Sequence, residues 1–267
     1  MISAHLSEPT SEADQSGPAR VVAGRDGGNV SSSSVVPPPG KRKAANPFRF
    51  VWNLLAAPPV PFLITKRSDA RVQSLIESLG PESVILNVGA GGKVLGRNVF
   101  NLDIFPTGST HALASVFTLP FADGVADLII LQGVLEHVPN PRRAVAEIVR
   151  VLKPGATFYT EMPFLEPYHE APIDVSRCTR YGLTLLCAPL TEVDSGIHIG
   201  PASTLTWILR EFLASLVSGG HPVVYRRASS IFGWVLFPLR YLDHWLERYD
   251  HFHRIASSFY YVGRKDV

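Results

Sequence analysis

The sequence predicts an α/β fold, built on a doubly wound and mainly parallel sheet. Short apolar runs alternate with amphipathic helical patterns, and a glycine cluster directly follows the first apolar run. Alternating strands and helices are typical of a parallel sheet with helices on both faces. A glycine cluster after the first strand lies at the carboxyl edge of such a sheet, where α/β proteins bind their ligands.

The first helix is expected to begin at Ser68 or Asp69, either of which is able to cap it, and to end before Gly80. Its apolar side chains recur at i, i+3, i+4 and i+7, which places them on one face. They are Val72, Leu75, Ile76 and Leu79. A second helix opens at Asn140 and Pro141 and has the same kind of apolar face.

Four apolar runs alternate with these helices and are predicted to be strands. They cover residues 83–88, 99–104, 127–132 and 156–162. Continuous apolar character, rather than strict alternation, is typical of strands that are buried on both faces. These strands are therefore expected to form the interior of the sheet.

The composition excludes several classes of protein. No run of 18 or more predominantly apolar residues occurs, so a membrane-spanning protein is not expected. The 25 basic and 23 acidic residues give a formal net charge of +2, which provides no strong basic field for nucleic acid. Two cysteines exclude a disulfide framework, and the first residues lack the pattern of a secretory signal, so we expect a cytoplasmic location.

Residues 1–46 are predicted to be a disordered tail, and residues 47–267 to form the folded domain. The first aromatic residue is Phe48, and the preceding segment is rich in Ser, Gly and Pro. Such a segment buries too little apolar surface to offset its loss of conformational entropy.

The glycine cluster occupies residues 87–92, Asn-Val-Gly-Ala-Gly-Gly. Glycine permits positive φ and lets a ligand approach the backbone closely. Asp103 ends the next predicted strand, where a carboxylate is able to accept hydrogen bonds from both hydroxyls of a ribose. The two features together predict a nucleoside site.

Two common nucleotide-binding patterns fit this site poorly. A phosphate-binding loop requires Lys and Ser/Thr where Arg97 and Asn98 stand. A dinucleotide fingerprint requires its third glycine three residues after Gly91, whereas Gly96 comes five residues on. An NAD-dependent oxidoreductase is retained as an alternative to the interpretation that follows.

Four further motifs appear in order along the chain: Leu-Pro-Phe-Ala-Asp at 119–123, Asp-Leu-Ile-Ile at 127–130, Val-Leu-Glu-His-Val at 134–138 and Arg-Val-Leu-Lys-Pro-Gly at 150–155. With the glycine turn, they resemble the class I S-adenosylmethionine-dependent methyltransferases, specifically the small-molecule branch with an LPF…LEHV…LKPG pattern. The resemblance implies a Rossmann-like sheet with residues 191–199 as its sixth strand and residues 257–263 as an antiparallel last strand.

The resemblance also implies S-adenosyl-L-methionine as the cofactor and assigns residues to it. The turn would hold the methionine part, Asp103 the ribose, and residues 115–116 would lie near the adenine. The full set is Asn87, Gly89, Ala90, Gly91, Asp103, Ile104, Ser115, Val116, Gln132 and Gly133. Asn87 and Ser115 stand where the family usually has acidic residues, and only residues 92–98 replace its usual first helix.

Candidates for the chemistry follow the fourth and fifth strands. His137 and His169 are candidate general bases for a hydroxyl acceptor. Tyr168, Asp174 and Arg177 either shape the acceptor pocket or pair with one another on the surface. We expect a small-molecule, carbohydrate or lipid-linked acceptor.

No metal site is expected from the sequence. Cys178 and Cys187 are nine residues apart and lack the spacing of a zinc site. The histidines at 244, 251 and 253 form a loose cluster that is typical of a solvated surface.

The charge deficit of the chain is concentrated between residues 181 and 239. More than fifty residues separate the predicted sixth and last strands, so residues 201–254 are interpreted as a helical insert. Aromatic and arginine side chains beside apolar helical patterns are typical of an interfacial membrane anchor, but an added helical layer or a lid on the acceptor site is the favoured interpretation. A membrane-associated binding protein with this fold and no turnover, in contact through residues 201–250, is therefore an alternative function; the sequence does not indicate an oligomeric state.

Overall fold

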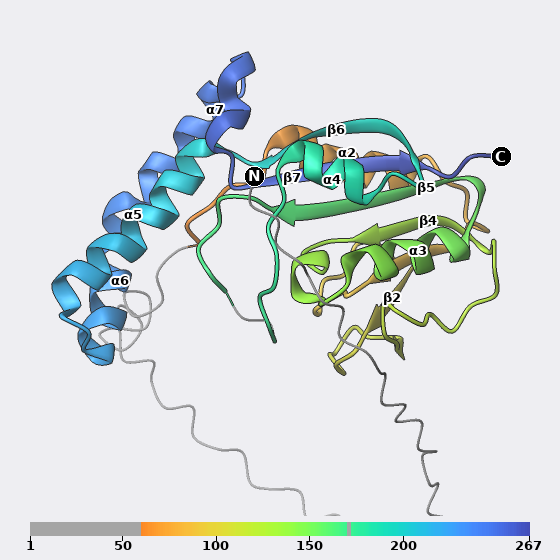
Figure 1. The fold of residues 1–267 in the computed structure, drawn as a ribbon, viewed down its shortest axis with the longest axis horizontal. Helices are drawn as coiled ribbons and strands as arrows, with labels where there is room; N and C mark the ends of the chain where they lie inside the picture. Colours follow the sequence, from red (N-terminus) through yellow and green to blue (C-terminus); the bar gives the residue numbers. More distant parts are fainter. Residues whose placement is uncertain (1–59, 170–171) are drawn as a thin grey trace, which may run out of the picture. The chain divides into compact units, whose positions relative to one another are not determined.

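The structure is a computed structural model that describes residues 60–169 and 172–267. The predicted tail at 1–46 lies outside the described residues. Figure 1 shows a central sheet with helices packed on it and a group of further helices beyond one end of the strands.

The described strands form a seven-stranded sheet in the order β3-β2-β1-β4-β5-β7-β6. Their bounds are β1 Ile85–Val88, β2 Val99–Asp103, β3 Ala112–Leu113, β4 Ala126–Leu131, β5 Leu152–Pro163, β6 Thr191–Ile199 and β7 Ser258–Arg264. The first five strands pair in parallel, and β7 runs antiparallel between β5 and β6. The predicted fold class is confirmed, including the antiparallel last strand.

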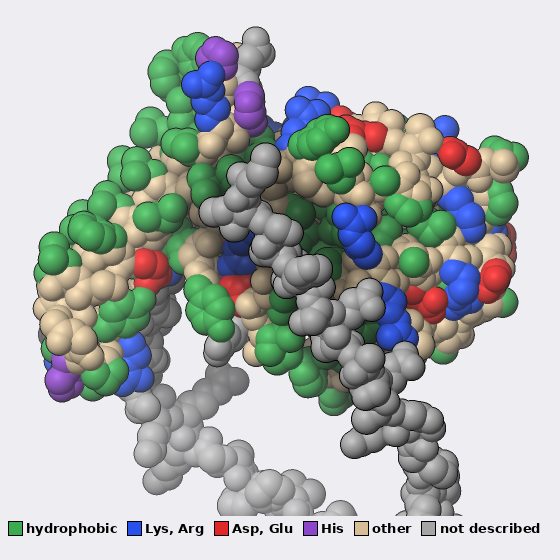
Figure 2. Space-filling model, in the orientation of Figure 1, with side chains coloured by type: hydrophobic (Ala, Val, Ile, Leu, Met, Phe, Trp, Pro, Cys, Tyr) green, Lys and Arg blue, Asp and Glu red, His purple; other side chains and the backbone are tan. Residues whose placement is uncertain are grey.

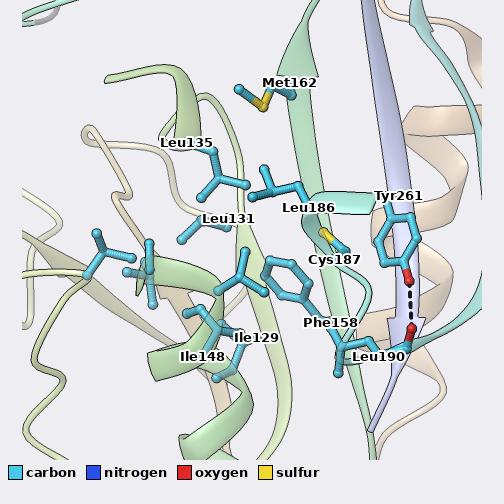
Figure 3. Packing of buried hydrophobic residues seen from close by; sticks show 14 of the residues in the cluster. Ile129, Leu131, Leu135, Ile148, Phe158, Met162, Leu186, Cys187, Leu190 and Tyr261 are labelled. Carbon is cyan, nitrogen blue, oxygen red and sulfur yellow. Dashed lines mark hydrogen bonds between the residues drawn. The ribbon is translucent and has the colours of Figure 1, made fainter. Parts of the chain in front are cut away.

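Helices cover both faces of the sheet because the central strand β4 alternates its side chains between two cores. Leu128 and Ile130 face α2, Lys66–Glu77, whereas Ile129 and Leu131 face α3, Pro141–Val151, and α4, Arg180–Leu186. Figure 3 shows the second core, where Ile148 of α3 and Leu186 of α4 meet Phe158 of β5. Every one of these strand side chains is essentially inaccessible to water, which stabilises the sheet by the hydrophobic effect.

The helix starts follow from capping side chains. Asn140 caps α3 as predicted, since its Oδ1 accepts a hydrogen bond from the backbone N–H of Arg143 at 3.1 Å. The predicted cap of the first helix is wrong: α2 begins at Lys66, and Thr65 Oγ1 accepts from the N–H of Ser68 at 3.3 Å. The Ser68 side chain is instead buried in a polar network described below.

Helices fill the segment between β6 and β7. They are α5 Pro201–Ser218, α6 Pro222–Leu236, α7 Asp243–Leu246 and the 3₁₀ helices η2 Phe237–Leu242 and η3 Asp250–Ile255. In Figure 1, α5 and α6 lie side by side as an antiparallel pair. None of the described helices is both long enough and apolar enough to cross a lipid bilayer.

A buried carboxylate joins the two ends of this helical segment. Asp243 accepts hydrogen bonds at 2.8 and 3.0 Å from the backbone N–H groups of Ala202 and Ser203, at the start of α5. It also accepts from the Ser203 hydroxyl at 2.6 Å. A side chain at Gly200 would collide with this carboxylate, which explains the glycine there. Asp243 therefore caps α5 from about forty residues away along the chain.

Candidate active site

A cavity of about 550 Å³ lies at the carboxyl edge of the sheet, beside β1, β2 and β4. Nine of the ten residues predicted to bind the cofactor line it: Gly89, Ala90, Gly91, Asp103, Ile104, Ser115, Val116, Gln132 and Gly133. The structure thus brings together residues from four separate segments of the chain.

The glycine turn wraps around the end of β2. Gly89, Gly91 and Gly92 have φ values of 72°, 55° and 93°, in the left-handed region that other residues rarely adopt. Their backbone is pinned by Asp103, whose Oδ2 accepts from the N–H of Gly91 at 2.7 Å. The other oxygen, Oδ1, accepts from the N–H of Phe105 at 2.9 Å. Each carboxylate oxygen keeps a lone pair for one further donor, so the pair of oxygens is able to accept from two neighbouring hydroxyls.

Asn87 is the tenth predicted cofactor residue, and the structure does not place it in the cavity wall. Its side chain is buried under the turn, where the amide donates to Asn101 Oδ1 at 3.0 Å and lies 3.5 Å from the carbonyl of Lys93. A neutral amide suits this position because its partners are an amide and a carbonyl rather than a cation. Asn87 therefore supports the shape of the turn.

At the opposite wall, Gln132 is held by partners on both sides of its amide. Its Oε1 accepts from Lys93 Nζ at 2.9 Å, and its Nε2 donates to Glu161 Oε1 at 2.6 Å. Lys93, which no sequence motif marked, directly follows the glycine turn and reaches the cavity lining through this bond to Gln132. A cation at this place is suited to the carboxylate of an amino-acid group.

The far end of the cavity is apolar. Ile104 and Phe105 are more than half exposed although both are large and hydrophobic, and Val116 also lines the cavity. Ser115 Oγ accepts from the N–H of Phe117 at 3.2 Å, so this hydroxyl shapes its own turn. Exposed apolar side chains on a cavity wall are suited to the flat face of a base.

Arg150 fixes the turn at residues 119–123, which follows the lining residues Val116 and Phe117. Its guanidinium donates to the carbonyls of Leu119 and Phe121 at 3.2 and 2.9 Å. Glu147 pairs with Arg150 at 2.7 Å and accepts from the N–H of Leu119 at 2.6 Å. The motifs at 119–123 and 150–155 therefore meet in space, which accounts for their joint presence in the sequence.

A second cavity, of about 340 Å³, adjoins the first, and both are lined by Gly133 and His137. Its walls come from β5, β6, β7, the loop after β5 and α5 of the helical segment. The remaining lining residues are Phe62, Glu136, Glu161, Met162, Pro163, Glu166, His169, His198, Ile199, Trp207 and Ser258. We call this space the acceptor cavity, after the acceptor that the family resemblance implies, because it shares lining residues with the first cavity.

His137 and His169, the two predicted bases, meet in the acceptor cavity. Their ring centroids lie 5.2 Å apart in an edge-to-face arrangement. His137 lies in the 3₁₀ turn η1, Leu135–His137, whereas His169 comes from the loop after β5. The backbone N–H of Val175 donates to the carbonyl of Glu136 at 2.8 Å, which ties this loop to η1.

Two carboxyl groups of the acceptor cavity are weaker acids than usual because they are buried away from water. Burial raises the pKa of Glu136 to about 7 and that of Glu166 to about 7. Glu136 is 3% exposed, and its Oε2 has no hydrogen-bond partner among the described residues. An unpaired buried carboxylate oxygen is costly unless a ligand completes it.

Glu161 differs from these two carboxyls because it belongs to a buried polar network. It accepts from Tyr159 at 2.8 Å and lies 3.2 Å from His198 Nε2. Ser68 Oγ joins Tyr159 and His198 Nδ1 at 2.8 and 2.7 Å. Burial also lowers the pKa of His198. The network fixes Gln132 through Glu161, and so connects the two cavities.

The three predicted acceptor residues do not line either of the two cavities. Asp174 and Arg177 form a two-pronged ion pair, and the Arg177 hydrogen bonds lower the pKa of Asp174 to about 2. Asp174 also accepts from the backbone N–H of His169 at 2.8 Å, so the pair positions His169. Tyr168 is 71% exposed.

Several lining residues were missed because no local pattern marks them. Trp207 lies on α5, and its ring centroid is 5.5 Å from that of Phe62 and 6.2 Å from that of His169. Only the fold brings these rings together. Glu136, by contrast, lies inside the motif at 134–138, next to the predicted base His137, so its position in the sequence was a usable signal.

Comparisons with known proteins match part of this chain. Residues 93–160 match the family model described as a methyltransferase domain. An uncharacterised methyltransferase of Mycobacterium sp. strain JLS is 48% identical over 48 residues, which is 18% of this chain and 19% of that protein. One from Mycobacterium leprae strain TN is 40% identical over 52 residues, covering 20% and 19%. This chain thus matches about a fifth of the length of these curated relatives.

Among solved structures, the [4+2]-cyclase SpnF is 17% identical, with 77% of this chain and 83% of that chain covered and a TM-score of 0.44. Phosphoethanolamine N-methyltransferase 2 of Haemonchus contortus, in complex with phosphomonomethylethanolamine and S-adenosylhomocysteine, is 11% identical. That match covers 74% of this chain and 53% of the other, with a TM-score of 0.44.

Proposed function

We propose that this chain, which carries a methyltransferase-domain segment at residues 93–160, transfers a methyl group from S-adenosylmethionine to an acceptor bound in the acceptor cavity. The observation that carries the proposal is the first cavity, where Asp103, the glycine turn and the apolar wall match the three parts of that cofactor. The ribose hydroxyls would donate to Asp103, and the adenine would lie against Ile104 and Phe105.

The methionine part completes the match. Its carboxylate would meet Lys93, and its ammonium and carboxylate groups would lie along the glycine turn. The methyl group would then face the wall formed by Gly133 and His137, behind which the acceptor cavity begins. Methyl transfer is an in-line displacement, so alignment of the two ligands supplies much of the rate enhancement.

Calorimetry with S-adenosylhomocysteine tests the cofactor assignment. We expect saturable binding that is weakened by Asp103→Asn and by Asp103→Ala. Absence of binding at millimolar ligand would remove the enzyme hypothesis and leave a protein with this fold and no turnover. Binding of a nicotinamide dinucleotide in the same titration, without binding of S-adenosylhomocysteine, would favour the oxidoreductase alternative.

The acceptor is proposed to be a small molecule, a carbohydrate or a lipid-linked molecule. The acceptor cavity offers an aromatic pair, Phe62 and Trp207, next to several groups able to take up a proton. Aromatic rings are suited to the apolar face of a sugar or to a lipid chain. A screen of hydroxylated acceptors for S-adenosylmethionine-dependent release of S-adenosylhomocysteine tests this proposal, and Trp207→Ala should raise KM for the acceptor while the affinity for cofactor is unchanged.

A contact of the helical segment with a membrane surface is a second proposal, which specific exposed residues favour. On α5 an exposed apolar stripe follows helical spacing, and α6 has another beside Arg226 and Arg227. The stripes contain Leu205, Ile208, Phe212, Leu216, Val224, Ile231 and Val235. Figure 2 shows hydrophobic side chains spread along these two helices on the face in view.

Apolar side chains beside arginines are suited to an anionic lipid surface. Flotation of the full chain with vesicles of anionic phospholipid tests the contact. Leu216→Glu combined with Ile231→Glu should abolish flotation, whereas Val193→Glu, an exposed apolar residue of β6, should not. Equal flotation of the two variants would refute the proposal.

A further inference from the structure

We infer that Glu136, His137 and His169 form a binding site for one divalent transition-metal ion at the wall between the two cavities. One ligand atom from each side chain lies within 4.8 Å of the others. The His137 Nε2 is 3.7 Å from Glu136 Oε1. Small side-chain rotations would bring such a set to the separations found around a single ion.

The hydrogen bond of His137 to a backbone carbonyl leaves its Nε2 free for a metal. Its Nδ1 lies 2.6 Å from the carbonyl of Ile173, and a carbonyl oxygen only accepts, so Nδ1 carries the proton. The lone pair is therefore on Nε2, which is the nitrogen near Glu136. A backbone carbonyl that fixes the second nitrogen of a ligating histidine is a regular feature of metal sites.

His169 is oriented in the same way by the loop after β5. Its Nδ1 lies 3.2 Å from the carbonyl of Pro167 and 3.8 Å from the carboxylate of Asp174. Both neighbours favour a proton on Nδ1, and they outweigh the longer contact of 3.5 Å with the Arg177 guanidinium, which is bonded to Asp174. The lone pair of His169 is therefore also on Nε2.

Glu136 supplies the third ligand and the strongest indication that something binds. Its side chain is 3% exposed, lines the acceptor cavity and has an oxygen without a hydrogen-bond partner among the described residues. No lysine or arginine lines that cavity within the described residues, and the Arg177 guanidinium, whose charge acts on Glu136, is already paired with Asp174. A metal ion held by the two neighbouring histidines is able to complete this oxygen.

Two histidines and one carboxylate favour a particular class of ion. Imidazole nitrogens suit zinc, iron, nickel and copper, whereas calcium, magnesium and manganese prefer oxygen ligands. Three protein ligands also leave open positions, as in catalytic rather than structural sites. An acceptor is therefore able to bind the ion directly.

The role of the ion rests on the proposed methyltransferase function, whereas its binding does not. A hydroxyl coordinated to the ion loses its proton more readily to water or to Glu166. The oxygen then forms a bond to the methyl carbon, the S–C bond breaks, and its electron pair stays on sulfur to give S-adenosylhomocysteine. The ion would thus orient the acceptor oxygen at the wall that faces the cofactor.

Titration of the tag-free full chain with Co²⁺, followed by its visible absorption and by calorimetry, tests the site. We expect one Co²⁺ per chain, with binding at least tenfold weaker in His169→Ala and in Glu136→Gln. His221→Ala, an exposed histidine outside both cavities, is the matched control and should bind as the wild type does. Circular dichroism verifies that each variant is folded.

The outcomes separate the metal from the methyl-transfer proposal. Absence of saturable Co²⁺ binding, or equal binding by wild type, His169→Ala and Glu136→Gln, would overturn the metal site. Binding of choline in place of Co²⁺ would also overturn it and assign the buried carboxyls to an organic cation. S-adenosylhomocysteine affinity, measured without metal, reports on the cofactor cavity alone.

Discussion

Replacement of Asp103 by asparagine should weaken the binding of S-adenosylhomocysteine while the fold is retained. Each oxygen of Asp103 already accepts one backbone N–H, from Gly91 or Phe105, and keeps one lone pair for one ribose hydroxyl. Asparagine removes the charge and turns one of the two acceptors into a donor. A hydrogen bond to a charged group contributes about 1.5–3 kcal/mol, so the affinity should fall by about 10- to 150-fold.

Calorimetry on the wild type, Asp103→Asn and Asp103→Ala measures this loss. Asp69→Asn, an exposed acid in the first turn of α2, changes the net charge equally and should leave the affinity unchanged. A fall of less than threefold in Asp103→Asn, or an equal fall in Asp69→Asn, would show that the carboxylate does not hold the ribose.

Three further predictions concern the same half of the molecule. Lys93→Met should lower the affinity for S-adenosylhomocysteine but not for 5′-methylthioadenosine, which lacks the amino-acid group, and calorimetry with both ligands checks it. Gly89→Ala should lower the free energy of unfolding by about 2–4 kcal/mol, because the residue has φ of 72° and an added Cβ would collide with Val134. Thermal unfolding measures this loss, and Gly80→Ala, where an added Cβ has nothing within 4 Å, is the control. Hydrogen bonds from Arg150 lower the pKa of Glu147, so their stabilisation is present above the ordinary glutamate pKa and is lost as pH falls through the lowered one. Arg150→Met should therefore lower the urea midpoint at pH 7, and its difference from wild type should shrink at pH 3.

The strands of the sheet could be predicted from the sequence because they are buried on both faces and are bounded by glycine, proline and capping residues. The predicted strand at 191–199 matches β6 residue for residue, and Asn140 opens α3 as expected. The two-residue β3 was missed, since it is too short to leave a pattern. The error at Ser68 arose because a buried serine and a capping serine look alike in sequence.

The two cavities differ in how far the sequence predicts them. The first cavity is built mainly from segments that follow β1, β2, β3 and β4, and nine of its twenty lining residues are ones that the sequence pattern marks for the cofactor. The acceptor cavity combines His137 and His169 with Phe62 and Trp207, which are far apart in the chain. Asp174 and Arg177 follow the second of their two predicted alternatives, since they pair with each other and do not line this cavity, and Asp174 accepts from the backbone N–H of His169.

The capping of α5 by Asp243 has a consequence for how this protein is able to vary. Because that carboxylate accepts hydrogen bonds from Ala202 and Ser203, α7 is joined to the start of α5, where the helical segment leaves the sheet. Trp207 lies one turn beyond this junction, and the tips of α5 and α6 lie further out. Insertions or deletions at the loop between α5 and α6 would therefore leave the position of Trp207 unchanged. The wall of the acceptor cavity and the outer surface of the hairpin are free to diverge independently.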